Sequence, residues 1–141
     1  MSKELIEKKI EQIRILINEL RALLQKPEIE FIKDAITLRA AERDFQLIVD
    51  LASDINTHIL LEGGKRTPDS YRQSFLDLKT ENIIEAGLAE TLALSARLRN
   101  ILVHEYDFDE DYAKFYQGAK RFLPAYDTYV GLVLGYLKNR Q

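Results

Sequence analysis

Residues 2–24 read Ser-Lys-Glu-Leu-Ile-Glu-Lys-Lys-Ile-Glu-Gln-Ile-Arg-Ile-Leu-Ile-Asn-Glu-Leu-Arg-Ala-Leu-Leu, and their apolar positions return every three or four residues. That period places one apolar stripe along a helix of about six turns, with charged side chains on the opposite face. Ser2 is a residue type that caps helix starts, and Pro27 prevents the helix from continuing. The stretch therefore predicts an amphipathic helix that packs against other helices.

The same period continues through the middle of the chain. A second helical pattern covers about residues 28–62, with a possible kink near Asp34, and the glycine pair at 63–64 ends it. Thr67 and Pro68 have the order of an N-cap followed by a first helical residue, which predicts a short helix over residues 69–78.

Two more long helices complete the pattern. Thr80 opens one that runs to about Leu102, and residues 105–109 form a turn between it and the last. Asp109 can cap the last helix, which continues to about Asn139 with a kink at Pro124. Only six glycines and three prolines occur in 141 residues, so few turns are expected and the elements must be long. Four long helices and a short one predict an all-α, antiparallel helical bundle in one domain spanning residues 1–141.

Composition excludes several classes of protein. The chain has no cysteine, so disulfides and thiolate metal sites are excluded, and a reducing cytoplasm is the expected compartment. The charged N-terminus does not resemble a signal peptide, and the longest apolar run, residues 126–137, is too short to cross a membrane. The net charge of −3 argues against attraction of nucleic acid by the whole surface. Any contact with RNA must therefore use a local site.

One segment departs from ordinary helix composition. Residues 97–106 read Arg-Leu-Arg-Asn-Ile-Leu-Val-His-Glu-Tyr, so a guanidinium, an amide, an imidazole and a phenol bracket three apolar residues. Such a grouping is costly near a core unless its members are paired or used. Arg99, Asn100, His104 and Tyr106 are therefore the candidate functional residues.

The spacing of Arg99 and His104 leaves two geometries open. Each helical residue turns by about 100°, so residues five apart lie roughly 140° apart around the axis, whereas Asn100 and His104, four apart, share a face. Either the helix ends before His104, or two copies of the segment complete one site. The second geometry predicts a homodimer with its cleft at the two-fold axis.

These two residues are sufficient for cleaving RNA without a metal ion. The histidine can accept or give a proton near neutrality, either at a ribose 2′-hydroxyl or at the leaving oxygen. The arginine can hold the phosphate and stabilise its developing charge. No spacing of His, Asp and Glu imitates a metal site, and no cofactor is expected.

The segment resembles a known signature. Arg99-Asn-x-Leu-Val-His104-x-Tyr106 is similar to the Arg-x4-His-x-Tyr motif of the HepT-like HEPN ribonucleases. Residues 38–43, 54–59 and 67–71 resemble further segments of that family, so the resemblance covers about residues 38–137.

The resemblance implies a homodimeric HEPN-like bundle in which both copies of the motif face one cleft. It implies a metal-independent endoribonuclease toxin of a toxin–antitoxin system, with Arg99 and His104 as catalytic residues and Asn100 orienting them. It also implies a minimal nucleotidyltransferase antitoxin that neutralises the toxin by transferring AMP to Tyr106.

Three further residues are candidates for the cleft. Asp54 could contact a base, although a helical pair with His58, four residues on, is the simpler interpretation. Arg39 and Glu42 have the spacing of a helical ion pair, with a cleft role as the alternative. Two other functions stay open for the whole chain: a non-catalytic HEPN module that binds a nucleotide or works with a nucleotidyltransferase, and a plain dimerisation scaffold.

Overall fold

The computed structural model describes residues 3–104 and 111–140, and all regular structure in these two parts is helical. Helix α1 spans Lys3–Leu23 and buries the apolar stripe expected from its sequence. The buried residues of this stripe are Ile6, Ile10, Ile13, Ile17 and Leu20. The prediction for the first helix is thus confirmed, whereas its suggested cap, Ser2, lies outside the described residues.

The second helical pattern is two helices rather than one kinked helix. Helix α2 spans Glu28–Lys33, and α3 spans Ala35–Glu62. Between them Asp34 has the extended torsions φ −96° and ψ 92°, and its side chain accepts a hydrogen bond from the Thr37 backbone N–H at 3.2 Å. A short acidic side chain thus caps α3 and breaks the helix, a local competition that periodicity does not report.

The next two helices also differ from expectation at their boundaries. Helix α4 spans Tyr71–Thr80, and its N-cap is Ser70 rather than Thr67. Helix α5 spans Ala86–His104, so Thr80 ends one helix instead of opening the next. The chain reverses at Asn82, whose φ of 60° lies in the left-handed region that asparagine tolerates, while the Ile83 N–H donates to the Leu78 carbonyl at 3.0 Å.

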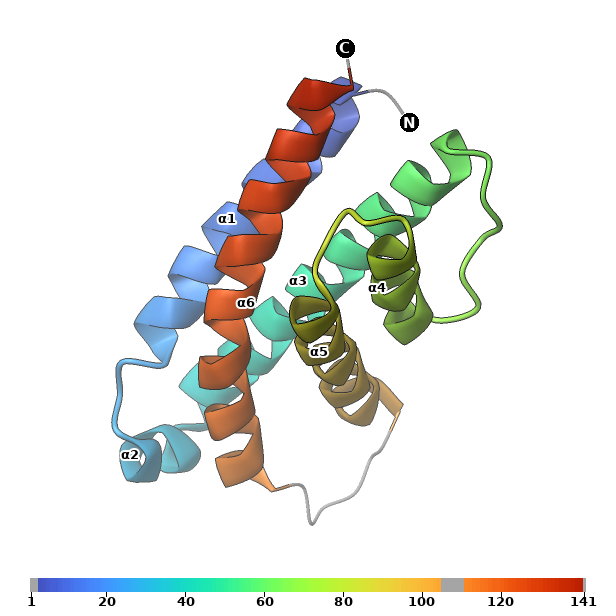
Figure 1. Cartoon of the computed structure of the whole chain (residues 1–141). Coiled ribbons are helices and arrows are strands. Elements are labelled where there is room, and N and C mark those ends of the chain that lie inside the picture. The colour runs from blue at the N-terminus through green and yellow to red at the C-terminus, as the bar shows by residue number, and fades with distance from the viewer. Residues whose placement is uncertain (1–2, 105–110, 141) are drawn as a thin grey trace.

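Helix α6 spans Tyr112–Asn139 and contains Pro124 within its length. Its N-cap is Asp111, and the predicted cap Asp109 lies outside the described residues. Helix α6 lies beside α1, and α4 beside α5, with α3 crossing behind and packing against α1, α4 and α5 (Figure 1). The end of α5 and the start of α6 lie at the lower end of the bundle in this view.

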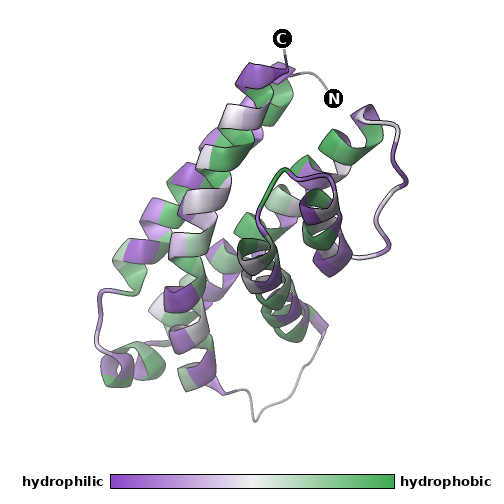
Figure 2. Ribbon diagram, in the orientation of Figure 1, coloured by the Kyte–Doolittle hydropathy of each residue, from purple (hydrophilic) through white to green (hydrophobic). Residues whose placement is uncertain are grey.

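The core combines apolar side chains with a buried polar network. Each helix alternates hydrophobic and hydrophilic residues along its length (Figure 2), as the amphipathic patterns require. Within the core the Tyr129 hydroxyl donates to Asn56 Oδ1 at 2.6 Å, and Asn56 Nδ2 donates to Ser74 Oγ at 3.0 Å. The Ser74 hydroxyl in turn donates to the carbonyl oxygen of Tyr71 at 2.7 Å. This network links α6, α3 and α4, and we call it the Tyr129–Asn56–Ser74 network.

The described helices were also assessed for membrane spans. None of those in residues 3–104 and 111–140 combines the length and the apolar character needed to cross a bilayer.

Candidate functional site

Arg99 lies where α3, α4 and α5 meet. Its Nε donates to Asp50 Oδ1 of α3 at 2.8 Å, and its guanidinium carbon lies 4.6 Å from the centre of the Tyr71 ring of α4. The side chain is only 14% exposed. Because one contact holds an edge of the guanidinium and the other holds a face, Arg99 has a fixed orientation rather than the freedom of a surface arginine.

Tyr71 of α4 and Asp50 of α3 contact the Arg99 side chain from the two neighbouring helices. Burial raises the pKa of the Tyr71 hydroxyl, and so do the charge of Asp50 and a hydrogen bond to its carboxylate, whereas the Arg99 charge lowers that pKa. The phenol therefore stays protonated and can donate to Asp50. Asp50 thus receives hydrogen bonds from both the arginine and the tyrosine.

Asn100 takes a second edge of the same guanidinium. Its Oδ1 accepts a hydrogen bond from Arg99 Nη1 at 3.2 Å. A guanidinium has five N–H groups, and Asp50 and Asn100 engage two of them. Within the described residues, the other three N–H groups on Nη1 and Nη2 have no acceptor, and they match what a phosphate requires.

His104 is the last residue of α5 and is exposed. Since α5 is continuous from Ala86 to His104, the helix does not end before the histidine. One of the two geometries left open by the sequence is therefore absent from the structure. Arg99 faces α3 and α4, and His104, about 140° further around the axis, faces away from them.

The region just after His104 carries the predicted modification site. Tyr106 and its neighbours between residues 105 and 110 lie outside the described residues, so the predicted modification site is not placed.

Arg39 and Glu42 form the predicted helical ion pair, with 2.6 Å between Nη1 and Oε1. Arg39 also donates from Nη2 to the Tyr112 hydroxyl at 3.2 Å and lies over that ring at 5.5 Å. These contacts join the start of α3 to the start of α6. The pair therefore has a clear role in packing.

Asp54 pairs with α1 rather than with its own helix. Its Oδ2 lies 3.5 Å from Lys9 Nζ, and its side chain is 56% exposed. The expected pair with His58 does not form, because Lys9 on the neighbouring helix offers a full positive charge. Asp54 lies one turn from Asp50 on α3, yet within the described residues it forms no hydrogen bond or ion pair with Arg99.

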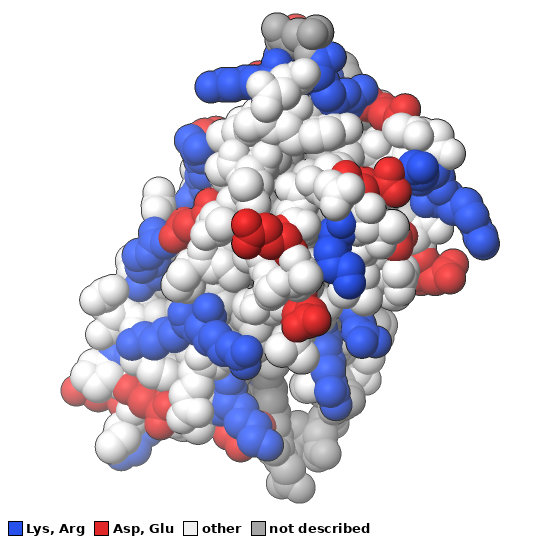
Figure 3. All heavy atoms as spheres, viewed as in Figure 1, with Lys and Arg blue, Asp and Glu red and all other residues white. Residues whose placement is uncertain are grey.

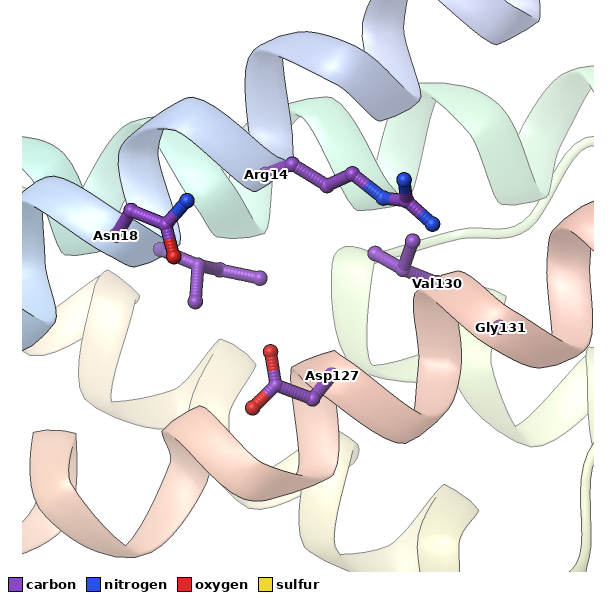
Figure 4. Close-up of a pocket in the computed structure, with 6 residues that line it drawn as sticks. Arg14, Asn18, Asp127, Val130 and Gly131 are labelled. Atoms are coloured by element: carbon purple, nitrogen blue, oxygen red, sulfur yellow. The ribbon is translucent and has the colours of Figure 1, made fainter.

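The surface outside the motif offers no competing chemical site among the described residues. In residues 3–104 and 111–140, no three His, Asp or Glu side chains gather in a group that could hold a metal ion. A pocket of about 320 Å³ lies between α1 and α6, where Arg14, Asn18 and Asp127 line it together with apolar residues (Figure 4). None of its lining residues belongs to the motif. On the face seen in Figure 3, basic and acidic side chains are interspersed rather than gathered by sign.

Comparison with known proteins identifies the family. Residues 6–133 match the family model described as Ribonuclease HepT-like. The chain belongs to the HepT-like family. A tRNA nuclease HepT from Aphanizomenon flos-aquae (strain 2012/KM1/D3) is 40% identical over 98 residues, which are 68% of this HepT-like chain and 65% of that relative. The chain thus spans about two thirds of the length of the curated relative it matches.

Two solved structures show the same fold as this HepT-like chain. A tri-AMPylated HEPN toxin of Shewanella oneidensis, in complex with an MNT antitoxin, has a TM-score of 0.86 at 23% identity, over 96% of this chain and 99% of that one. YutE of Bacillus subtilis, a cytosolic protein of unknown function, has a TM-score of 0.86 at 18% identity, over 99% and 93%. These likenesses confirm the predicted HEPN-like helical fold.

Asp50 and Tyr71 contact Arg99 in this HepT-like chain, and the sequence did not single them out. Tyr71 belongs to one of the segments that carried the family resemblance, but no role was expected for it. Asp50 lies one turn before Asp54 on the same face of α3, so a search of that face for acids near a buried arginine would have included it.

Proposed function

We propose that the protein is a ribonuclease toxin whose site combines Arg99 of one copy with His104 of another. The observation that carries the proposal is the difference in surroundings between Arg99 and His104, which lie on the same helix, α5. Arg99 is held inward, its outer N–H groups have no acceptor among the residues that the structure describes, and His104 is exposed at the helix end. The family match to HepT-like ribonucleases and the curated tRNA nuclease relative support RNA as the substrate.

The proposed reaction is cleavage of RNA by its own 2′-hydroxyl. The 2′ oxygen attacks the adjacent phosphorus, the bond to the 5′ oxygen breaks, and a cyclic phosphate and a free 5′-hydroxyl result. His104 moves a proton, either from the attacking hydroxyl or to the leaving oxygen. Arg99 holds the phosphate oxygens through Nη1 and Nη2 as negative charge builds on them. Because the chain's own groups supply each step, the proposed reaction needs no metal ion.

The proposed homodimer is supported by the apolar surface of α5. Leu94 is 42% exposed, and Ile101, two turns further along α5 and therefore on nearly the same face, is only half-buried in a single chain. A second copy placed against this surface would cover these side chains and bring its own α5 end to the first. Such an isologous contact brings each histidine toward the arginine of the other chain.

The proposed partner is a nucleotidyltransferase antitoxin that transfers AMP to Tyr106. The Shewanella oneidensis neighbour, an AMPylated HEPN toxin bound to an MNT antitoxin, supports this partner. Tyr106 follows His104 by two residues, so its AMP phosphate would compete with RNA for the same pair of side chains. The cytoplasm is the proposed compartment, since the chain has no cysteine and the YutE neighbour is described as cytosolic.

The proposal predicts the behaviour of two single variants. Arg99→Ala removes the group that holds the phosphate, and His104→Ala removes the proton-transfer group, so each should lower the rate of RNA cleavage by at least about 10²-fold. Cleavage of tRNA and mRNA substrates is measured on gels with and without a metal chelator, and light scattering checks that both variants keep the wild-type oligomeric state.

A mixing experiment tests the shared site. When Arg99→Ala and His104→Ala chains are unfolded together and refolded, half of the dimers should be mixed, and each mixed dimer has one intact pair. Activity should return to about a quarter of the wild-type value. A mixture that stays inactive would show that one chain supplies both residues. Wild-type dimer that binds AMP but leaves RNA intact would favour the alternative, a nucleotide-binding module.

A further inference from the structure

Arg99 is the central residue of the proposed site, and its orientation is set from outside α5. Of its contacts, Asn100 is exposed and lies on the same helix, so it moves with the arginine. Asp50 belongs to α3 and is 28% exposed at its side chain. It therefore ties the arginine to the core of the bundle. Nε lies closest to the arginine's aliphatic stem, so a bond there fixes the rotation of the whole guanidinium.

Asp50 also acts against simple attraction of RNA. Its carboxylate neutralises the arginine, so the Arg99–Asp50 pair carries no net charge toward an approaching phosphate. If attraction alone were required, this carboxylate would be a disadvantage. Its benefit is directional, because two anchors and the Tyr71 ring leave only the outer N–H groups available to a ligand.

We propose that Asp50 is a positioning residue for RNA cleavage, which aims Arg99 at the scissile phosphate through the Nε hydrogen bond and not through its charge. The inference rests on the proposed function and deepens it, since it assigns a role in that reaction to a residue of α3. The Tyr71 ring packs against the face of the Arg99 guanidinium and helps to hold the same orientation.

Three substitutions separate position from charge. Asp50→Asn keeps an oxygen that can accept from Nε and removes the charge. Asp50→Glu keeps the charge and moves the acceptor by one methylene group. Asp50→Ala removes both. The matched control is Asp127→Ala, which likewise breaks an arginine–aspartate ion pair between two helices, here with Arg21 at 2.6 Å, but away from the motif.

The expected result is a split between kcat and KM. Asp50→Ala should lower kcat at least tenfold and Asp50→Glu severalfold, because misplacing a reacting group by about 1 Å can cost 10²-fold. Asp50→Asn keeps the acceptor oxygen in place, so its kcat should stay within about threefold of the wild-type value. KM should be unchanged or lower in Asp50→Ala, since a charge that repels RNA has been removed. Asp127→Ala should match wild type in both constants.

Several outcomes would overturn the inference. A wild-type kcat in Asp50→Ala would show that the hydrogen bond is dispensable. Equal losses in Asp50→Ala and Asp127→Ala would indicate a general effect on folding. If Asp50→Glu stayed active while Asp50→Asn were inactive, the charge of residue 50 and not its hydrogen bond would be responsible for the effect.

A second measurement does not depend on cleavage. The Arg99 Nε–H signal in a ¹⁵N-correlated spectrum, assigned by its loss in Arg99→Lys, should exchange slowly with water in wild type and Asp50→Asn, and at least tenfold faster in Asp50→Ala. Rapid exchange in wild type would overturn the inference. If the wild-type protein cleaves no RNA, the proposed function is wrong. The exchange rate of the Arg99 Nε–H then still decides whether Asp50 fixes the orientation of the arginine.

Discussion

Asp44 of α3 has a buried oxygen, Oδ2, for which the described residues supply no hydrogen-bond partner. The residue is 6% exposed and faces α1, where Glu19 lies nearby. Burial, followed by the negative charge of Glu19, raises the pKa of the Asp44 carboxyl to about 6. The folded state therefore holds this proton more tightly than the unfolded state does, and the fold loses stability as the pH rises through 6.

Asp44→Asn should stabilise the protein at pH 8 and by clearly less at pH 5, because the loss of stability in the wild type begins near the unfolded pKa of about 4 and is complete only above the folded pKa of about 6. The amide keeps the shape of the side chain without a charge to bury, and the expected gain is about 1–2 kcal/mol, or roughly 3–6 °C in Tm. Thermal unfolding followed by circular dichroism at both pH values checks it. Asp54→Asn, exposed on the same helix, is the control, and a gain equal at pH 5 and pH 8 would exclude ionisation as the cause.

Sequence reasoning found the residues of the motif but not their partners. Arg99, Asn100 and His104 stand out because polar groups interrupt a helical apolar pattern, and that pattern is visible in one segment. Asp50 and Tyr71 are 49 and 28 positions away from Arg99 along the chain. Their contact depends on how three helices pack, which periodicity within each helix does not define.

At the scale of elements, the junction between α2 and α3 is held by Asp34. The Asp34 carboxylate caps α3 through Thr37 and forms an ion pair with Lys26. The hydrogen bond from Lys26, followed by those from Thr37, holds the pKa of Asp34 well below its usual range. Its contribution to stability is therefore present above the pKa of the unfolded chain, near 4, and is lost as the pH falls below that value.

Asp34→Ala should lower Tm at pH 7 by about 2–6 °C, because the first turn of α3 loses its cap and Lys26 loses its partner. Asp34→Asn, which keeps a capping oxygen, should lose less. Asp69→Ala provides the control, since Asp69 is exposed and caps no helix. Calorimetry of the four proteins gives the comparison, and an Asp34→Ala Tm equal to that of Asp69→Ala would contradict the assigned role.

Helix types were predictable from the sequence, and helix ends were less so. The periodic stripes of α1, α3 and α6 identified long helices, because apolar residues recur through many turns. The breaks at Asp34 and Asn82 were misjudged, since each depends on a single side chain or a single backbone torsion within a continuous helical pattern. Ser70 was missed as a cap because Thr67 and Pro68 gave a stronger signal.

At the scale of the whole molecule, regulation is predicted to act on the same segment as catalysis. After co-expression with a neighbouring nucleotidyltransferase gene, the intact mass of the purified chain should increase by one or more AMP groups, and RNA cleavage should be lost. Tyr106→Phe should show neither change, because it lacks the acceptor hydroxyl. Mass increments that persist in Tyr106→Phe would move the modification to another residue.

The Tyr129–Asn56–Ser74 network connects the interior of the bundle to the residues that hold Arg99. Its last hydrogen bond ends on the backbone of Tyr71, the residue whose ring supports Arg99. Under the proposed function, substitutions that abolish activity therefore need not change a residue that contacts RNA. Loss of the Asn56 amide or the Tyr129 hydroxyl should disturb the packing of α4 and the ring that supports Arg99, so inactivating substitutions are expected in the protein interior as well as at the proposed site.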